Sequence, residues 1–203
     1  MAKTGILGGT FDPIHLGHLI TAENALDGAG LDRVLLIPTG CSYFKEDQKV
    51  TPPQLRYEMT CLAAADHPRL FVTDMETKRP GNSYTAETLA QLHTEYPEDE
   101  LYYIVGADTL VMMNLWKDPE YIFSSCHILV ETRQDEVAAK GLLEEAEQLR
   151  RKFDAQITIL PARNVEISST EIRQRVKDGR SIRYLVPRAV EEFIHQHRLY
   201  LNS

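Results

Sequence analysis

Short apolar runs alternate with longer amphipathic stretches along most of this chain. The apolar runs are typical of buried strands, and they fall at residues 5–7, 34–37, 70–73, 101–105, 128–131 and 157–160. The stretches between and after them have helical character, at residues 16–29, 53–65, 83–96, 136–153, 170–177 and 187–197. Six strands that alternate with helices predict an α/β fold, a Rossmann-like doubly wound parallel sheet with C-terminal helices.

Several of these elements carry signals at their ends. Pro38 ends the second apolar run, and Pro53 suits the first turn of the helix that follows. Asn82 or Ser83 is expected to cap the next predicted helix, which Pro97 cannot continue. These signals agree with the boundaries that the apolar pattern predicts.

Length and composition fit one globular domain. The 203 residues are 43% hydrophobic and 26% charged, which is typical of a folded domain with a sizeable core. We expect a single domain over residues 1–203, in which residues 166–203 form a C-terminal helical part. We expect no membrane segment, since no apolar stretch reaches about 18 residues, and no signal peptide before the first strand.

Charge and cysteine content narrow the function. The formal net charge of -8 argues against non-specific nucleic-acid binding, which needs a basic surface. An anionic ligand must then be held by a local cluster of donors. Cys41, Cys61 and Cys126 lack CxxC spacing, so we interpret them as free thiols in a cytoplasmic protein without structural zinc.

The segment after the first strand has the features of a phosphate site. In an open parallel sheet, ligands bind where strands lead into helices. Gly8 and Gly9 let backbone amides approach a ligand, and the next helix offers free N–H groups. His15 and His18 are three residues apart, which places both rings on one face, and Gly17 between them is expected to leave room for a ligand. A single histidine here could be a buried core residue or a helix cap, but two histidines at this spacing favour a phosphate-binding site.

A second segment near the C-terminus also opens a helix. Ser168 or Ser169 can cap it, and the hydroxyls point outward with the first free amides. Arg173 lies one turn further on and can return its guanidinium to the same place. A plain capping box formed by Ser168 and Glu171 is the alternative.

Together these two segments resemble the signature of the HxGH superfamily of adenylyl- and cytidylyltransferases. Residues 78–89 and 106–110, with Leu115 and Trp116, resemble nicotinate-nucleotide adenylyltransferases more narrowly. The order and spacing match from about residue 4 to 195. The sequence departs from the family after the second strand, where residues 38–45 replace a Pro-Pro-His-Lys-like run and Lys45 stands in for the lysine.

The resemblance implies a role for each matched position. The catalytic residues would be His15, His18 and Arg173, with His18 facing the reacting α-phosphate. The ATP-binding residues would be Gly8, Gly9, Thr10, Phe11, Gly106, Asp108, Ser168, Ser169 and Thr170. The mononucleotide would be bound by Lys45, Tyr84, Thr85 and Trp116. Mg²⁺ would arrive with ATP and needs few protein ligands.

Local explanations remain open for two of these residues. Trp116 follows Met112, Met113 and Leu115 and could be a core residue, although the resemblance favours a partly exposed stacking platform. Asp108 could cap the helix after Gly106, which is compatible with ligand contact.

The activity implied is adenylyl transfer from ATP to nicotinate mononucleotide, which gives deamido-NAD and pyrophosphate in NAD biosynthesis. Phosphopantetheine adenylyltransferase is an alternative that would not explain residues 79–85 or Trp116. A dinucleotide oxidoreductase lacks support because no G-x-G-x-x-G is present. A non-catalytic nucleotide-binding regulator is a further alternative. The sequence leaves open a homo-oligomer and the preference for nicotinate over nicotinamide mononucleotide.

Overall fold

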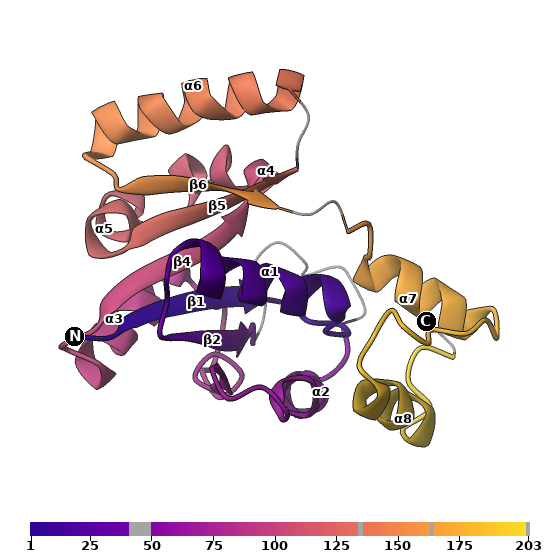
Figure 1. Ribbon diagram of the computed structural model, residues 1–203. Helices are drawn as coiled ribbons and strands as arrows, with labels where there is room; N and C mark the ends of the chain where they lie inside the picture. Colours follow the sequence, from indigo (N-terminus) through magenta and orange to yellow (C-terminus); the bar gives the residue numbers. More distant parts are fainter. Residues whose placement is uncertain (41–49, 134–135, 163–164, 202–203) are drawn as a thin grey trace. The chain divides into compact units, whose positions relative to one another are not determined.

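The computed structural model describes residues 1–40, 50–133, 136–162 and 165–201. Lys45 and Cys41 therefore lie outside the described residues. The elements follow the chain in an alternating order (Figure 1). The strands are β1 (Lys3–Gly9), β2 (Arg33–Pro38), β3 (Leu70–Val72), β4 (Glu100–Gly106), β5 (His127–Arg133) and β6 (Ile157–Ala162). The helices are α1 (Leu16–Gly28), α2 (Pro53–Ala64), α3 (Thr85–Glu95), α4 (Ala107–Leu110), the 3₁₀ turn η2 (Met113–Leu115), α5 (Pro119–Ser125), α6 (Glu136–Phe153), α7 (Ser169–Lys177) and α8 (Arg188–Gln196).

The six strands form one parallel sheet in the order β3-β2-β1-β4-β5-β6. This confirms the predicted α/β class. The register places Ile6 of β1 opposite Tyr103 of β4, and Gly106 of β4 opposite Glu131 of β5. β2 and β3 lie on one side of β1, and β4, β5 and β6 lie on the other. The point between β1 and β4 is therefore the topological switch point, where such sheets bind ligands. Both of these strands end in glycine.

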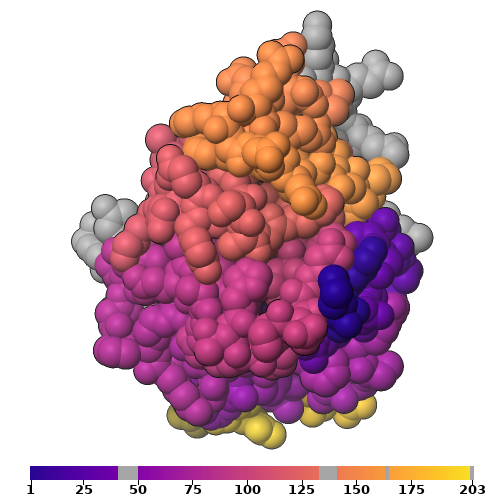
Figure 2. Space-filling model, turned by 90° about the vertical axis from the view of Figure 1, so that its left-hand side faces the viewer, coloured from indigo at the N-terminus to yellow at the C-terminus, as the bar shows by residue number. Residues whose placement is uncertain are grey.

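Burial explains why the strands read as unbroken apolar runs. The five central residues of β4 are all buried, because helices cover parallel sheets on both faces. Ile6, Val34 and Ile128 are completely buried in the same way. At the amino end of the strands the chain emerges at the surface, where Figure 2 shows the N-terminal residues in indigo and Met1 is exposed.

The described chain divides into two compact units, each assembled from three stretches. The first contains residues 1–7, 21–34 and 84–164, and the second contains residues 8–20, 35–83 and 165–203. In the first unit, α6 runs alongside β5 and β6 (Figure 1) and packs against α4 and α5. In the second, α8 packs against α2. None of the helices in the described ranges is long and apolar enough to cross a membrane.

The structure corrects two expectations about helices. Neither Asn82 nor Ser83 caps α3, because the chain turns at Gly81 with a φ of 81° and stays extended through the N-cap, Tyr84. The short elements α4, η2 and α5 were not expected. By contrast, Pro53 does occupy the first turn of α2.

Candidate active site

The loop after β1 is tightly folded around Phe11. Phe11 has a left-handed backbone with a φ of 48°, and its side chain is buried. A Cβ placed on Gly9 would lie 2.6 Å from Cε1 of Phe11, so only glycine fits there. Gly8 is exposed, and Thr10 is half-buried. The Phe11 ring meets the ring of His18 edge-on, with 4.9 Å between centroids. The buried Phe11 ring of this loop thus packs against the ring of His18.

His15 and His18 stack on each other at the start of α1. Their ring centroids are 3.6 Å apart and the planes differ by 22°, which confirms that the two rings share one face. The backbone N–H of His15 donates to Nδ1 of His18 at 3.2 Å. This bond requires Nδ1 to be unprotonated, so neutral His18 carries its proton on Nε2. His18 therefore presents a fixed N–H donor.

The space beside Gly17 is not the ligand space that the sequence suggested. A Cβ on Gly17 would lie 3.0 Å from Cε1 and Nδ1 of His15. The ring of His15 fills this space, so Gly17 makes room for an imidazole. Nδ1 of His15 is itself buried and has no hydrogen-bond partner within the described part of the chain.

Both imidazoles are neutral at physiological pH. Burial lowers the pKa of His15 to about 4. Burial, together with repulsion from a protonated His15, lowers the pKa of His18 to about 3. The expected free N–H groups at the start of α1 are largely taken up, because the amides of Leu16 and His18 donate to the carbonyls of Leu185 and His15. The histidine pair thus offers hydrogen-bond donors without a fixed positive charge.

The first turn of α7 is bonded to the loop that carries the histidines. Oγ of Ser169 donates to the carbonyl of Pro13 at 2.9 Å. Nη1 of Arg173 donates to the carbonyl of Asp12 at 2.8 Å, and Nη2 donates to Oγ1 of Thr170 at 3.2 Å. The two segments predicted to form one anion site are therefore joined within the second unit, although about 160 residues separate them in the chain.

Ser168 is the N-cap of α7. Its Oγ accepts the backbone N–H of Glu171 at 3.1 Å, which confirms the capping role and excludes Ser169 from it. The first intrahelical bond runs from Ile172 to the carbonyl of Ser168. The amides of Ser169 and Thr170 have no partner inside the helix and remain suited to an anion.

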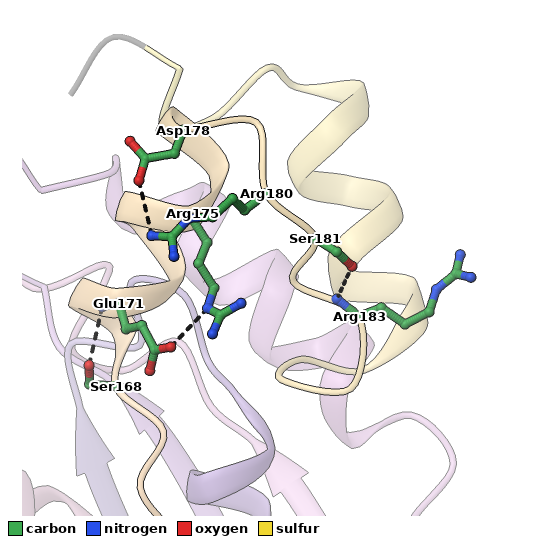
Figure 3. A network of polar contacts seen from close by, with 7 residues as sticks. All are labelled: Ser168, Glu171, Arg175, Asp178, Arg180, Ser181 and Arg183. Carbon is green, nitrogen blue, oxygen red and sulfur yellow. Dashed lines mark hydrogen bonds and ion pairs between the residues drawn. The ribbon is translucent and has the colours of Figure 1, made fainter.

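The other charged residues around α7 pair with one another (Figure 3). Arg175 donates to Glu171 at 2.8 Å, and Arg180 donates to Asp178 at 3.0 Å. The backbone N–H of Arg183 donates to Oγ of Ser181. Arg173 differs from these arginines because it donates to the histidine-bearing loop.

Sequence reasoning missed two residues beneath this loop. Arg56 of α2 is 1% exposed and donates to three backbone carbonyls, those of Thr10 at 2.6 Å, Thr51 at 2.8 Å and Gly40 at 2.9 Å. Tyr200 donates to Oδ1 of Asp12 at 2.7 Å. No local pattern marks either residue, because Thr10 is 46 positions from Arg56 and Asp12 is 188 positions from Tyr200.

Three of the predicted mononucleotide residues, Tyr84, Thr85 and Trp116, lie in the first unit. Oγ1 of Thr85 and the hydroxyl of Tyr103 are 3.3 Å apart, and the Tyr103 ring meets the ring of Trp116 edge-on at 6.2 Å. Nζ of Lys117 lies 4.1 Å from the centroid of Tyr84. Trp116 is partly exposed, as expected for a platform and not for a core residue. Tyr103 and Lys117 are additions that the sequence did not indicate.

Gly106 and Asp108 lie at the carboxyl end of β4. Gly106 is exposed, is the N-cap of α4, and has open space where a Cβ would be. Asp108 is exposed in the first turn of α4, so the alternative that it caps the helix is wrong. Within the described residues, no group of three or more His, Cys, Asp or Glu side chains is placed to hold a metal ion.

Comparison with known proteins agrees with this geometry. The cytidylyltransferase-like family model matches residues 6–175. A probable nicotinate-nucleotide adenylyltransferase of Lachnoclostridium phytofermentans is 38% identical over 99% of this chain and 100% of its own length. One from Synechococcus sp. (strain JA-3-3Ab) is 44% identical over 98% of this chain and 95% of its own.

Solved structures share the fold at lower identity. A Plasmodium falciparum nicotinic acid mononucleotide adenylyltransferase complexed with NaAD has a TM-score of 0.80 and 17% identity, and covers 100% of this chain and 99% of its own. Because the curated relatives exceed 30% identity over nearly the full length, sequence and fold lead to one assignment. The chain belongs to the nicotinate-nucleotide adenylyltransferase family and is a nucleotidyltransferase.

Proposed function

We propose that this enzyme transfers the adenylyl group of ATP to nicotinate mononucleotide, giving deamido-NAD and pyrophosphate. One observation carries the proposal beyond the family name. The stacked pair of His15 and His18 and the first turn of α7 with Arg173 are bonded into one donor-rich site in the second unit. Such a site suits a triphosphate, and the relatives' names supply the acceptor.

The reaction needs no covalent enzyme intermediate. A phosphate oxygen of the mononucleotide attacks the α-phosphorus of ATP, the new P–O bond forms, and the bond to the β-phosphate breaks with release of pyrophosphate. Catalysis then consists of positioning and of stabilising negative charge on the phosphate oxygens. This explains a site built from N–H donors without a nucleophilic side chain.

Each donor has a place in this scheme. Nε2 of His18 faces the α-phosphate, and His15 supports the neighbouring oxygens. Amides of Gly8, Gly9, Thr10 and Phe11 line the loop. Arg173 keeps further N–H donors for the β- and γ-phosphates after bonding Asp12 and Thr170, and Ser168, Ser169 and Thr170 add the free end of α7.

ATP enters as its magnesium complex. Magnesium holds phosphate oxygens and several waters in preference to an all-protein cage. The carboxylate of Asp12 is close in sequence to the histidines, but Tyr200 and the N–H of Thr51 already occupy both of its oxygens. We therefore assign the ion to the substrate.

The mononucleotide is bound in the first unit. The ring of Trp116 stacks on the nicotinate, and Tyr84 frames it. The carboxylate of nicotinate needs N–H donors, which the free amides at the start of α3, beginning at Thr85, supply. Gly106 and Asp108 meet the adenosine part, and Lys45 is assigned to the mononucleotide from the sequence alone. We place the reaction in the cytoplasm, in accord with the free thiols of Cys61 and Cys126.

An acceptor panel tests this function. Purified enzyme is given MgATP with nicotinate mononucleotide, nicotinamide mononucleotide or phosphopantetheine, and pyrophosphate release is followed by a coupled assay. We expect the highest kcat/KM with nicotinate mononucleotide and a deamido-NAD product identified by mass. A preference for phosphopantetheine, or no turnover with either mononucleotide, would overturn the proposal.

A further inference from the structure

The loop that carries the histidines is held at every residue from 10 to 13. Arg56 binds the carbonyl of Thr10, the Phe11 side chain is buried, Arg173 binds the carbonyl of Asp12, and Ser169 binds that of Pro13. These anchors come from α2 and α7. A further anchor comes from the residues after α8.

The carboxylate of Asp12 is the centre of this arrangement. Asp12 is 4% exposed, and a buried carboxylate is stable only when donors surround it. Oδ2 accepts the backbone N–H of Thr51 at 3.2 Å, and Oδ1 accepts the hydroxyl of Tyr200 at 2.7 Å. The carbonyl oxygen of Thr51 in turn accepts a hydrogen bond from Nε of Arg56. Tyr200 thus completes a connected polar network under the loop.

The backbone after α8 turns at Arg198 and Tyr200, where Tyr200 contacts Asp12. Arg198 and Tyr200 both have left-handed backbones, with φ values of 50° and 65°, which a residue with a Cβ adopts only when its surroundings compensate. Tyr200 is buried, and burial next to the charge of Asp12 raises its pKa. The hydroxyl therefore stays protonated and remains a donor throughout the physiological range.

We propose that Tyr200 is a positioning residue for adenylyl transfer, which acts through Asp12 to fix the loop that places His15 and His18. This inference rests on the proposed function, from which its substrates are taken. The hydroxyl of Tyr200 touches no substrate in this scheme. The hydrogen bond from Tyr200 to Asp12 determines how rigidly His15 and His18 are aligned with the phosphates of ATP. This alignment matters most in the transition state.

The test is Tyr200→Phe, which keeps the ring and removes only the hydroxyl group. We expect kcat to fall roughly tenfold or more, with KM for nicotinate mononucleotide within about twofold of wild type, because its ring is bound in the first unit. Backbone amides of the peptide covering residues 8–20 should exchange hydrogen faster in this variant. Tyr184→Phe is the matched control, since Tyr184 is 83% exposed, and it should change neither kcat nor exchange.

A second variant tests the same link with Tyr200 intact. Asp12→Asn keeps the shape of the side chain and removes the charge that accepts the hydroxyl. We expect a similar loss of kcat, and no further loss in the double variant, because the two residues act as one unit. Additive losses, or wild-type kcat and exchange in Tyr200→Phe, would overturn the proposal. If the wild-type enzyme showed no adenylyl transfer, the proposed function would be contradicted instead. The hydrogen-exchange measurement would still show whether Tyr200 fixes the loop.

Discussion

The two imidazoles of His15 and His18 lie face to face, and this stacking sets their charge. With centroids 3.6 Å apart and little solvent nearby, a second proton would meet both a desolvation cost and the charge of the first ring. Neutral rings avoid that repulsion while no phosphate is bound, and they still donate through N–H. A bound triphosphate would favour the protonated form of His15, so substrate binding should take up a proton.

The lowered pKa values predict how stability depends on pH. His15 titrates at about 4 in the folded chain and near 6.5 when unfolded. Between these values the unfolded state binds more protons, so the free energy of unfolding falls as pH drops from about 6.5 to 4. His15→Gln should remove up to about 1.4 kcal/mol per pH unit of this slope. Denaturant titrations of the wild type and of His15→Gln at several pH values measure this slope. If the free energy of unfolding depended on pH equally in both proteins, the prediction would be wrong.

The fixed tautomer of His18 predicts a loss of turnover without a loss of fold. His18→Ala removes the Nε2 donor that faces the α-phosphate in the proposed scheme. We expect kcat to fall by about two to three orders of magnitude. Circular dichroism should remain unchanged, because the ring is partly exposed and the main anchors of the loop are elsewhere. Near-wild-type turnover would remove His18 from the mechanism.

Among the elements, α7 shows how a short helix can serve both stability and binding. It has nine residues, so it depends on its cap and on its contacts with the loop. Ser168 satisfies one free amide at its start, while Ser169 and Arg173 are turned toward the loop. The cap thus leaves the amides of Ser169 and Thr170 for a ligand.

This division of roles predicts separate effects for neighbouring serines. Ser168→Ala should lower the free energy of unfolding by about 1 kcal/mol through loss of the N-cap, as measured by urea denaturation. Ser124→Ala is the control, because Ser124 is exposed and its Oγ donates to the carbonyl of Tyr121. A stability change in Ser168→Ala no larger than in the control would show that the cap contributes little.

Elements with a long apolar pattern could be predicted from the sequence, and short ones could not. All six strands and the long helices appear near their expected positions. The four-residue α4 and seven-residue α5 are too short to show a helical period. α1 ends at Gly28 because Gly30 adopts a left-handed φ of 61° and Leu31 bonds back to Leu26. Such a cap fixes a boundary that periodicity leaves open by a residue.

The site divides in the same way between local and distant information. His15, His18 and Arg173 stand at helix starts, where their positions favour an anion site, and the family resemblance implies their roles. Arg56 looks like an ordinary surface cation of an amphipathic helix, yet it is buried and donates to three backbone carbonyls, those of Thr10, Gly40 and Thr51. Only the tertiary fold brings these carbonyls together. The residues that touch a ligand can therefore be anticipated more readily than those that hold them.

At the scale of the whole molecule, the two kinds of chemistry fall in different units. The second unit contains the histidines and α7, with donors for phosphates, and the first contains Tyr84, Thr85 and Trp116, with aromatic surfaces. The net charge of -8 makes this concentration of donors necessary, because no general positive field attracts the anions. The triphosphate should then depend mainly on donors of the second unit, and the nicotinate ring on aromatic residues of the first.

That separation predicts selective damage from Trp116→Ala. Stacking on an aromatic side chain contributes roughly 1–3 kcal/mol per ring, so the variant should bind nicotinate mononucleotide at least about fivefold more weakly and MgATP about as well as wild type. A ligand that binds only the folded state raises Tm by an amount that increases with the ratio of its concentration to its Kd. Thermal denaturation with each ligand alone should show a reduced shift for the mononucleotide and an unchanged shift for MgATP. Leu115→Ala, at an exposed neighbour of Trp116, controls for the loss of apolar surface. If Trp116→Ala weakened both ligands equally, the ring would be stabilising the fold as a whole and would have no special part in stacking on the nicotinate.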